Sequence, residues 1–380
     1  MLSKKINIAN DMKLLTMTKL IFNVLLGIST VCLSLFLLSN LAYSQLQDIT
    51  TISTRDHFDN ITGDIISNES LYVFLNTNDE IMNCPPELVV YVHGVWVGKN
   101  SLETPNEIFD RLKLSLQENG YQFPLIGYSW DSDSDISPQG WNTAKHIASQ
   151  NGESLGIFLI DYKQQCPQTD MRVIAHSLGA RVVLEALNFI DNNSIWNNKG
   201  FVIPSVHLLG AAVDNEEVSI DLSDGDDDNL FSFTTDYDPS VKSIYGHVIE
   251  NQVSNFYNLY NENDNALEVR TTNAYYPFFE KDFALGNNGI DGFSDPPHNY
   301  TEYSVKDEIN NISDADADGN CDLQAQEWVP NLFGFGSWEN VCTIREVGDN
   351  HFGYIGFRED ESHVFDDGAI DRIVNDWTSS

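Results

Sequence analysis

The stretch that most constrains this chain is Met171 to Leu187, MRVIAHSLGARVVLEAL. The β-branched pair Val173 and Ile174 enters the short segment AHSLG, after which apolar residues recur at helical spacing. Small residues stand two positions before and two positions after Ser177, as a sharp turn between a strand and a helix requires. We therefore expect Ser177 at the tip of such a turn, at the N-terminus of the following helix.

This turn matches the pattern G-x-S-x-G, which exposes a serine hydroxyl for nucleophilic attack, except that Ala175 replaces the first glycine. The small Cβ of alanine makes the replacement sterically mild. The alternative is an ordinary strand-to-helix turn in which Ser177 only caps the helix. Other segments of the sequence are needed to distinguish these two interpretations.

Strand and helix patterns alternate along most of the chain after residue 70. Strands are expected at residues 71–75, 87–92, 123–130, 171–175, 201–212, 230–235 and 303–305. Helices are expected at 104–120, 141–163, after Ser177, at 240–260 and at a closing segment that includes 370–377. The first helix has a clear start, because Thr104, Pro105 and Glu107 form the pattern of a capping box with proline at N1. The alternation predicts an α/β fold with a doubly wound, mostly parallel sheet.

The first 44 residues have the pattern of an export signal. Lysines precede an apolar run from Leu20 to Leu41, and small residues follow it before Gln45. This order is typical of a cleaved signal peptide, although the run is also long enough for an uncleaved membrane anchor. Both alternatives place the rest of the chain outside the cytoplasm, either secreted or anchored to the membrane.

The exported part is expected to be one domain. Residues 45–70 form a polar lead segment, and residues 71–380 form the domain itself. An insertion at 261–348 carries an aromatic segment and an aspartate-rich loop. The chain has 57 acidic and 20 basic residues, giving a net charge of −37, which argues against nucleic acid as a partner.

Four of the five cysteines follow the N-terminal apolar run, which contains Cys32. An even number in an oxidising compartment favours two disulfides. Cys84 and Cys166 each precede an expected strand, so they meet at one sheet edge if those strands are parallel neighbours. We therefore predict the pair Cys84–Cys166 and, by remainder, Cys321–Cys342.

Three segments occur in an order that resembles the α/β-hydrolase superfamily, and most of all its lipase- and esterase-like group. They are VVYVHG at 89–94, GYSW at 127–130 and AHSLGARVVLEAL at 175–187. The resemblance in the order of elements extends from residue 71 to 377. It implies a nucleophilic serine followed along the chain by an acid and then a histidine, so that Ser177 is the expected nucleophile.

The loop after the strand at 87–92 is the expected source of an oxyanion hole. The glycine in His93-Gly94 allows a backbone amide to approach the substrate closely. We expect the donors to be the amide of Val95 or Trp96, together with that of Leu178.

The acid is expected in a loop after a strand that follows Ser177. Asp238 in TTDYDPSV is the first choice, because this segment resembles the corresponding strand end of the family. Asp238 also precedes Pro239 and so suits a helix N-cap. Asp236 and Asp214 are the alternatives.

The base is expected to be a histidine late in the chain. His351 lies in the loop GDNHFGY just before the closing helix, where the family carries its catalytic histidine. His298 is the alternative, although it precedes the last expected strand. His176 is expected to pack in the turn beside Ser177, and His363 to lie on the surface.

These residues predict a serine hydrolase that forms an acyl-enzyme and needs no cofactor for catalysis. Carboxylester hydrolysis of a small-molecule or lipid-like substrate is the expected reaction. Acyl transfer, thioester cleavage and peptide cleavage need the same residues and stay open. A non-catalytic binding or surface protein with this fold is the alternative of another class.

The segment DADADGNCD resembles the first half of an EF-hand calcium loop. Its candidate ligands are Asp314, Asp316, Asp318, Asn320 and Asp322. Ala325 stands where that loop has its last glutamate, so a solvated acidic loop is the alternative. The expectation is a structural Ca²⁺ site.

Overall fold

A computed structural model of the chain divides into two units, residues 1–48 and 49–380. The structure describes part of the second unit. The described residues are 49–67, 71–98, 104–135, 137–220, 244–268, 283–290, 294–309, 324–330, 336–342, 351–356 and 366–379. The expected signal peptide and the expected strand at 230–235 lie outside these ranges.

An eight-stranded sheet forms the centre of the second unit, in the order β2-β1-β4-β3-β5-β6-β7-β8. Its strands are β1 (Thr50–Ser53), β2 (Val73–Leu75), β3 (Glu87–Val92), β4 (Leu125–Ser129), β5 (Asp170–His176), β6 (Ile203–Leu209), β7 (Val253–Tyr260) and β8 (Tyr300–Ser304). Within this sheet, β2 pairs antiparallel with β1, and the other neighbours are parallel. The mostly parallel sheet expected from the sequence is therefore confirmed.

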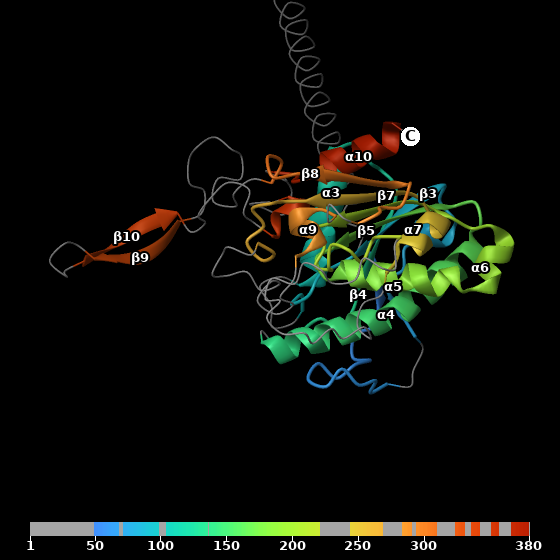
Figure 1. Cartoon of the computed structure of the whole chain (residues 1–380), viewed down its shortest axis with the longest axis horizontal. Helices are drawn as coiled ribbons and strands as arrows, with labels where there is room; N and C mark the ends of the chain where they lie inside the picture. The colour runs from blue at the N-terminus through green and yellow to red at the C-terminus, as the bar shows by residue number, and fades with distance from the viewer. Residues whose placement is uncertain are drawn as a thin grey trace, which may run out of the picture. The chain divides into compact units, whose positions relative to one another are not determined.

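Helices cover both faces of the sheet, as Figure 1 shows. The described helices are α2 (Asp79–Met82), α3 (Pro105–Glu118), α4 (Pro138–Gln165), α5 (Gly179–Asp191), α6 (Ser194–Lys199), α7 (Gly246–Gln252), α9 (Leu285–Asn288) and α10 (Ile370–Ser379), with a 3₁₀ turn at Gly353–Ile355. Leu88, Val90 and Val92 of β3 pack into the core with α4 and α5, whereas Val89 and Tyr91 pack into the core with α3 and α10. The strand is buried on both faces because successive side chains of a strand point to opposite sides.

The start of α3 follows the sequence pattern. The Thr104 side chain accepts a hydrogen bond from the Glu107 amide, and the Glu107 carboxylate accepts one from the Thr104 amide at 2.7 Å. The predicted capping box is confirmed. This local signal could be identified because every residue in it lies within one turn.

The prediction of a helix at 240–260 is wrong for its second half. Within the described residues of that range, α7 ends at Gln252, and residues 253–260 form β7 between β6 and β8. Phe256 and Leu259 are three residues apart, a spacing that suggests one helix face. On a strand this spacing places them on opposite faces, and each packs into a different core. The apolar spacing of this strand, which is buried on both faces, therefore resembles that of a helix.

One more strand of the sheet falls in a segment where the sequence analysis expects none, because β1 lies within the expected polar lead segment at 45–70. The strand expected at 303–305 is present as β8, which begins earlier, at Tyr300, within the expected insertion at 261–348. Elsewhere in that insertion, β9 (Gln324–Pro330) and β10 (Gly336–Cys342) form an antiparallel hairpin. No helix in the described part of the chain is both long and apolar enough to cross a membrane.

A disulfide joins Cys84 to Cys166, with their Cα atoms 5.2 Å apart. The prediction is confirmed for the expected reason, because β3 and β5 are parallel neighbours and each cysteine precedes one of them. The pair Cys321–Cys342 stays a prediction, since Cys321 lies outside the described residues.

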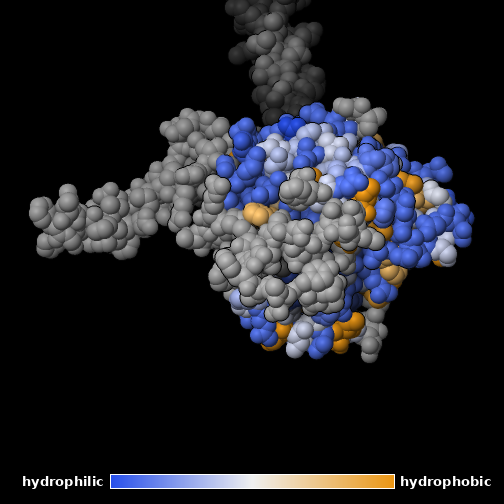
Figure 2. All heavy atoms as spheres, in the orientation of Figure 1, coloured by the Kyte–Doolittle hydropathy of each residue, from blue (hydrophilic) through white to orange (hydrophobic). Residues whose placement is uncertain are grey.

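The surface reflects the acidic composition of the chain. In the view of Figure 2, hydrophilic residues cover most of the surface formed by described residues, and hydrophobic residues form small separate patches. Scattered exposed apolar residues of this kind are normal for a folded protein.

Candidate active site

Ser177 lies in the turn between β5 and α5, as the sequence predicts. Its φ angle is +55°, a left-handed conformation that is rare for a residue with a side chain. Backbone hydrogen bonds hold this conformation, because the Ser177 amide donates to the Leu209 carbonyl at 3.0 Å and the Ala212 amide donates to the Ser177 carbonyl at 3.2 Å. The end of β6 therefore fixes the strained turn that presents the serine.

Two glycines allow the chain to pack closely around Ser177. A Cβ built on Gly94 would lie 2.7 Å from the Ser177 Cβ and 3.3 Å from its Oγ. A Cβ built on Gly179 would lie 2.6 Å from the Val92 carbonyl oxygen. A larger residue at either position would push the loop containing His93 and Gly94 away from the serine. Steric crowding therefore explains why glycine stands at both Gly94 and Gly179.

His93 fixes this loop from inside the protein. Its Nδ1 lies 2.7 Å from the Gly94 carbonyl oxygen, and its Nε2 accepts a hydrogen bond from the Trp130 amide at 3.3 Å. Nδ1 therefore carries the hydrogen and donates to Gly94. The ring stacks on Trp130 with an interplanar angle of 10°. Burial, reinforced by the nearby Arg55 guanidinium, holds the pKa of His93 well below its ordinary value, so His93 is neutral and structural.

Arg55 supports the far end of the same loop, a role that the sequence analysis missed. Its guanidinium donates to the Val97 carbonyl at 2.6 Å, to the Ser129 hydroxyl at 2.6 Å and to the Asp133 carboxylate at 3.1 Å. The loop after β3 is thereby tied to the end of β4. A single arginine shortly after the short strand β1 has no sequence pattern that would reveal this function.

Of the three predicted oxyanion donors, Trp96 is not suited to that role. Its amide already donates to the Ser132 carbonyl at 2.8 Å. Within the described residues, the amides of Val95 and Leu178 donate to no acceptor, although both residues are buried. Val95 and Leu178 therefore remain candidates to bind an oxyanion beside Ser177.

His351 forms a buried pair with a carboxylate that the sequence analysis did not select. Its Nδ1 lies 2.7 Å from Oδ2 of Asp264, and the two side chains are 7% and 0% exposed. The other oxygen of Asp264 accepts hydrogen bonds from the amides of Ala266 and Leu267 at 3.0 and 3.2 Å. The Tyr354 hydroxyl donates to Oδ2 at 3.1 Å. Both carboxylate oxygens thus face donors, which is the environment of a buried anion.

Tyr354 stays protonated in this arrangement. Burial and the neighbouring Asp264 carboxylate raise the pKa of its hydroxyl well above the ordinary value. The ring of Tyr354 also occupies space that only glycine leaves free at position 210, where a Cβ would lie 2.6 Å from the ring. Tyr354 therefore holds Oδ2 of Asp264, whereas the backbone amides of Ala266 and Leu267 hold Oδ1.

Asp264 occupies the position beside His351 that the sequence analysis assigned to Asp238. A carboxylate oxygen only accepts hydrogen bonds, so the contact with Asp264 requires the hydrogen of the His351 ring to be on Nδ1. Asp238 and Asp236 lie outside the described residues. Asp214 follows β6, and its backbone forms an isolated antiparallel β-bridge with Ala284. The available signal for Asp264 was its position after a strand, and the interpretation of β7 as a helix concealed it.

The alternative base, His298, does not belong to this site. It lies just before β8, at the sheet edge where the parallel strands begin, whereas Ser177 follows the end of β5. Its side chain is 76% exposed and lies 2.9 Å from a Glu250 carboxylate oxygen. His176, in contrast, is buried beside Ser177, as predicted, with its Nε2 2.8 Å from the His351 carbonyl oxygen.

The predicted calcium ligands from Asp314 to Asp322 lie outside the described residues. In the part of the chain that the structure describes, no group of three or more His, Cys, Asp or Glu side chains could hold a metal ion. The calcium site stays a prediction.

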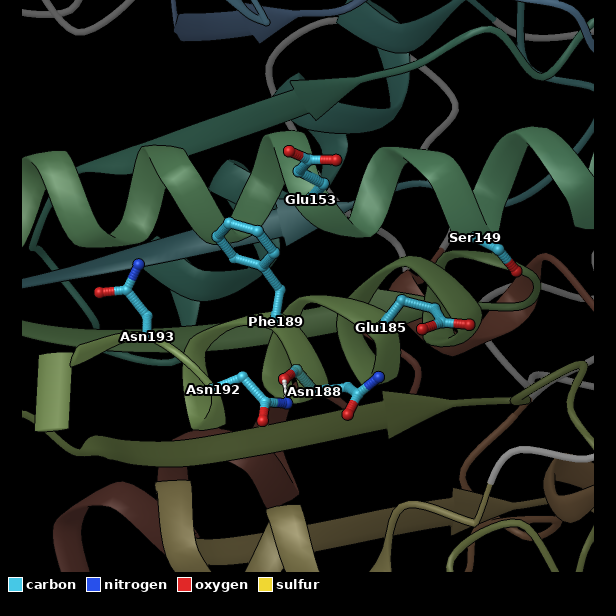
Figure 3. Close-up of a pocket in the computed structure, with 7 residues that line it drawn as sticks. All are labelled: Ser149, Glu153, Glu185, Asn188, Phe189, Asn192 and Asn193. Carbon is cyan, nitrogen blue, oxygen red and sulfur yellow. Dashed lines mark hydrogen bonds between the residues drawn. The ribbon is translucent and has the colours of Figure 1, made fainter. Parts of the chain in front are cut away.

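A pocket of about 350 Å³ lies away from Ser177, between α4 and the C-terminal half of α5 (Figure 3). Its lining consists of Ser149, Glu153, Glu185, Asn188, Phe189, Asn192 and Asn193. Because Ser177 precedes the opposite end of α5, this pocket is separate from the candidate active site.

The fold and the turn at Ser177 define an α/β hydrolase architecture. Residues 77–273, just over half of the chain, match the family described as "Alpha/beta hydrolase of unknown function (DUF900)". The chain belongs to this family.

Among solved structures, the chain is similar to the catalytic core domain of acetyl xylan esterase from Trichoderma reesei. The identity is 10% and the TM-score 0.26, over 36% of this chain and 68% of that one. It is also similar to a Trichoderma reesei cutinase in complex with a phosphonate inhibitor, with 21% identity and a TM-score of 0.22, over 34% of this chain and 53% of that one. A search of curated protein sequences gives no match.

Proposed function

We propose that this chain is a serine hydrolase in which Ser177 is the nucleophile, His351 the general base and Asp264 the acid. The observation that carries the proposal is the buried contact of 2.7 Å between His351 Nδ1 and Asp264 Oδ2. The loop of His351 is in turn bonded to His176, the residue next to Ser177. A buried histidine–carboxylate pair beside a strained serine is the constellation that acyl transfer requires.

The pairing with Asp264 sets the tautomer of His351. A carboxylate accepts hydrogen bonds, so Nδ1 of His351 carries the hydrogen and Nε2 keeps its lone pair. Nε2 can then accept the proton of the Ser177 hydroxyl. Asp264 stabilises the imidazolium that results, because its charge is buried 2.7 Å away and screened little by water.

The proposed reaction proceeds in two halves. Ser177 Oγ attacks the acyl carbonyl while His351 takes its proton, and the amides of Val95 and Leu178 bind the oxygen that becomes negative. His351 returns the proton to the leaving group, and an acyl-enzyme remains. Water then attacks this ester with the same histidine as base, releasing the acid and restoring Ser177.

Carboxylester hydrolysis is the proposed activity, with a small-molecule or lipid-like ester as substrate. Membership of an α/β hydrolase family supports a hydrolase, and the segments at 89–94, 127–130 and 175–187 resemble its lipase- and esterase-like group. Acyl transfer, thioester cleavage and peptide cleavage use the same atoms and are distinguished by substrate. A binding protein without catalysis would not need the Ser177 hydroxyl.

The proposal includes export from the cytoplasm. The disulfide between Cys84 and Cys166 supports an oxidising compartment. The apolar run from Leu20 to Leu41 would serve as a cleaved signal or as a membrane anchor. Catalysis by these residues needs no cofactor, and the segment 314–322 is proposed to bind a structural Ca²⁺.

Labelling with a fluorophosphonate probe tests the function directly, because the probe reacts with an activated serine. We expect the wild type to be labelled at Ser177 and both Ser177→Ala and His351→Ala to stay unlabelled. Ser149→Ala in the separate pocket is the matched control and should label like the wild type. A folded wild type that does not react would contradict the proposal. Hydrolysis of an ester chain-length panel then defines the acyl group.

A further inference from the structure

His176 connects the strand of the nucleophile to the loop of the base. It is the last residue of β5, immediately before Ser177, and its side chain is buried. Its Nε2 lies 2.8 Å from the backbone carbonyl oxygen of His351, 175 residues later in the chain. A carbonyl oxygen only accepts hydrogen bonds, so Nε2 carries a hydrogen and donates it.

The ring of His176 also packs against the loop that it binds. Its centroid lies 4.7 Å from the His351 ring, 6.1 Å from the Phe352 ring and 5.9 Å from the Tyr354 ring. The hydrogen bond holds the backbone of His351, while the ring contacts limit how the side chains of the loop can move. Asp264 fixes the other end of the same residue through Nδ1.

His176 is neutral in this position. Burial lowers its pKa well below the ordinary value, and the nearby His351, Arg111 and His93 also disfavour a positive charge. With its hydrogen on Nε2, the ring can lie close to His351 without adding a second charge. This matters because His351 becomes positively charged when it takes the serine proton.

We propose that His176 is a positioning residue, whose Nε2–H holds the His351 backbone in register with the adjacent Ser177. The inference rests on the proposed function, since it assigns His176 a role in the same reaction. Ser177 and His176 are neighbours in the chain, so one hydrogen bond links the placement of the base to the placement of the nucleophile. A misplacement of about 1 Å between reacting groups reduces rates by roughly 100-fold.

Three substitutions separate the hydrogen bond from the packing. His176→Gln places an amide nitrogen near the position of Nε2 and can donate to the His351 carbonyl. His176→Phe keeps a ring of similar shape but has no donor. His176→Asn carries its amide nitrogen near the position of Nδ1, too short to reach. The measurement is the rate of Ser177 labelling by a fluorophosphonate, with circular dichroism and melting temperature recorded for each variant.

We expect His176→Phe and His176→Asn to label about 10- to 100-fold more slowly than the wild type, and His176→Gln to recover most of the rate. A role in packing alone predicts the reverse order, with phenylalanine above glutamine. Labelling of His176→Phe at the wild-type rate, or faster than His176→Gln, would overturn the proposal. If His176→Phe does not fold, the labelling rates of His176→Gln and His176→Asn are compared instead. The proposal then requires His176→Gln to label faster than His176→Asn.

A second measurement does not depend on activity. In ¹⁵N NMR of histidine-labelled protein, with His176→Gln used to assign the signal, His176 should be neutral and protonated on Nε2 at pH 6. A charged ring, or a hydrogen on Nδ1, would overturn the inference even in an active enzyme. If instead the folded wild type is not labelled at Ser177 while NMR shows the expected tautomer, the proposed function fails and the contact is structural.

Discussion

Asp264 and His351 lie 87 residues apart in the chain, and their side chains meet at 2.7 Å in a buried environment. Asp264 follows β7, whereas His351 precedes the 3₁₀ turn at residues 353–355. The contact therefore depends on β7 taking its place in the sheet beside β6. Tyr354, three residues after His351, donates to the same carboxylate and makes the two loops one hydrogen-bonded unit.

Substitution of Asp264 by asparagine should abolish most of the activity. Asparagine keeps the size of the side chain, but it removes the charge that stabilises the His351 imidazolium, so we expect esterase turnover to fall about 10³- to 10⁴-fold. The measurement is turnover of a short-chain ester, together with a melting curve to show that the variant is folded.

Asp238→Asn is the matched control for this experiment, because Asp238 is the acid that the sequence favours. It should retain wild-type turnover. A large loss in Asp238→Asn with little change in Asp264→Asn would contradict the assignment of Asp264.

Gly94→Ala should inactivate the protein by displacing the loop beside the serine. The new Cβ would lie 2.7 Å from the Ser177 Cβ, a distance that van der Waals contact does not allow. We expect fluorophosphonate labelling to slow by roughly 100-fold, as for other small displacements of reacting groups. Gly120→Ala is the comparison, since a Cβ there meets nothing within 4 Å but must adopt a positive φ. It should lower the melting temperature and leave labelling unchanged.

His93 should make the folded protein less stable as the pH falls. The unfolded chain binds a proton at His93 near pH 6.5, whereas burial lowers the pKa of His93 in the folded protein. The unfolded state therefore binds more protons below pH 6.5, and the free energy of unfolding falls by about 1.4 kcal/mol per pH unit from this group. Urea unfolding from pH 7.5 to pH 5 measures the slope.

His93→Asn does not titrate in that range and keeps a donor near the position of Nδ1. We expect it to be less stable than the wild type at pH 7.5, because it loses the stacking on Trp130. Its stability should decline less steeply with falling pH. If the free energy of unfolding falls with pH at the same slope in both proteins, His93 does not contribute to the pH dependence of stability.

Removal of the disulfide should affect stability and not catalysis. Cys84 and Cys166 precede β3 and β5, so they lie at the sheet edge opposite Ser177. The double variant Cys84→Ser with Cys166→Ser should lose about 2–4 kcal/mol of unfolding free energy. Its rate of Ser177 labelling in native buffer should match the wild type. Dithiothreitol should lower the melting temperature of the wild type by more than that of the double variant, which keeps the predicted pair Cys321–Cys342.

Calcium should stabilise the protein through the segment DADADGNCD if this segment binds the ion. We expect the melting temperature to rise on titration with Ca²⁺ and to fall with a chelator. Asp316→Ala should remove this response. Asp226→Ala, in the less patterned acidic run 221–228, is the control and should keep it. The absence of any shift in the wild type would argue against a structural ion.

Local patterns in the sequence were sufficient for much of the fold. The capping box at Thr104, the turn at Ser177 and the buried run of β3 each depend on residues close together in the chain. The disulfide between Cys84 and Cys166 could also be predicted, because it required only that two recognised strands be neighbours. The resemblance to the family pointed to the loop of His351, and the structure places that histidine beside the Asp264 carboxylate.

The features that the sequence did not reveal depend on contacts between distant segments. Residues 253–260 have a spacing of apolar side chains that suits a helix, and only the two cores on either side of the sheet make them a strand. Trp96 is excluded as an oxyanion donor by the Ser132 carbonyl, which no local pattern reveals. Arg55 supports the same loop by bonds to residues that become neighbours only on folding.

The sequence by itself determined the turn at Ser177 and the class of fold, because a strand-to-helix turn and alternating elements are encoded by neighbouring residues. The tertiary structure decided which carboxylate faces His351, because that choice depends on which strand brings its loop to the same sheet edge. Asp264 reaches His351 since β7 is buried between β6 and β8, where its apolar residues are covered on both faces.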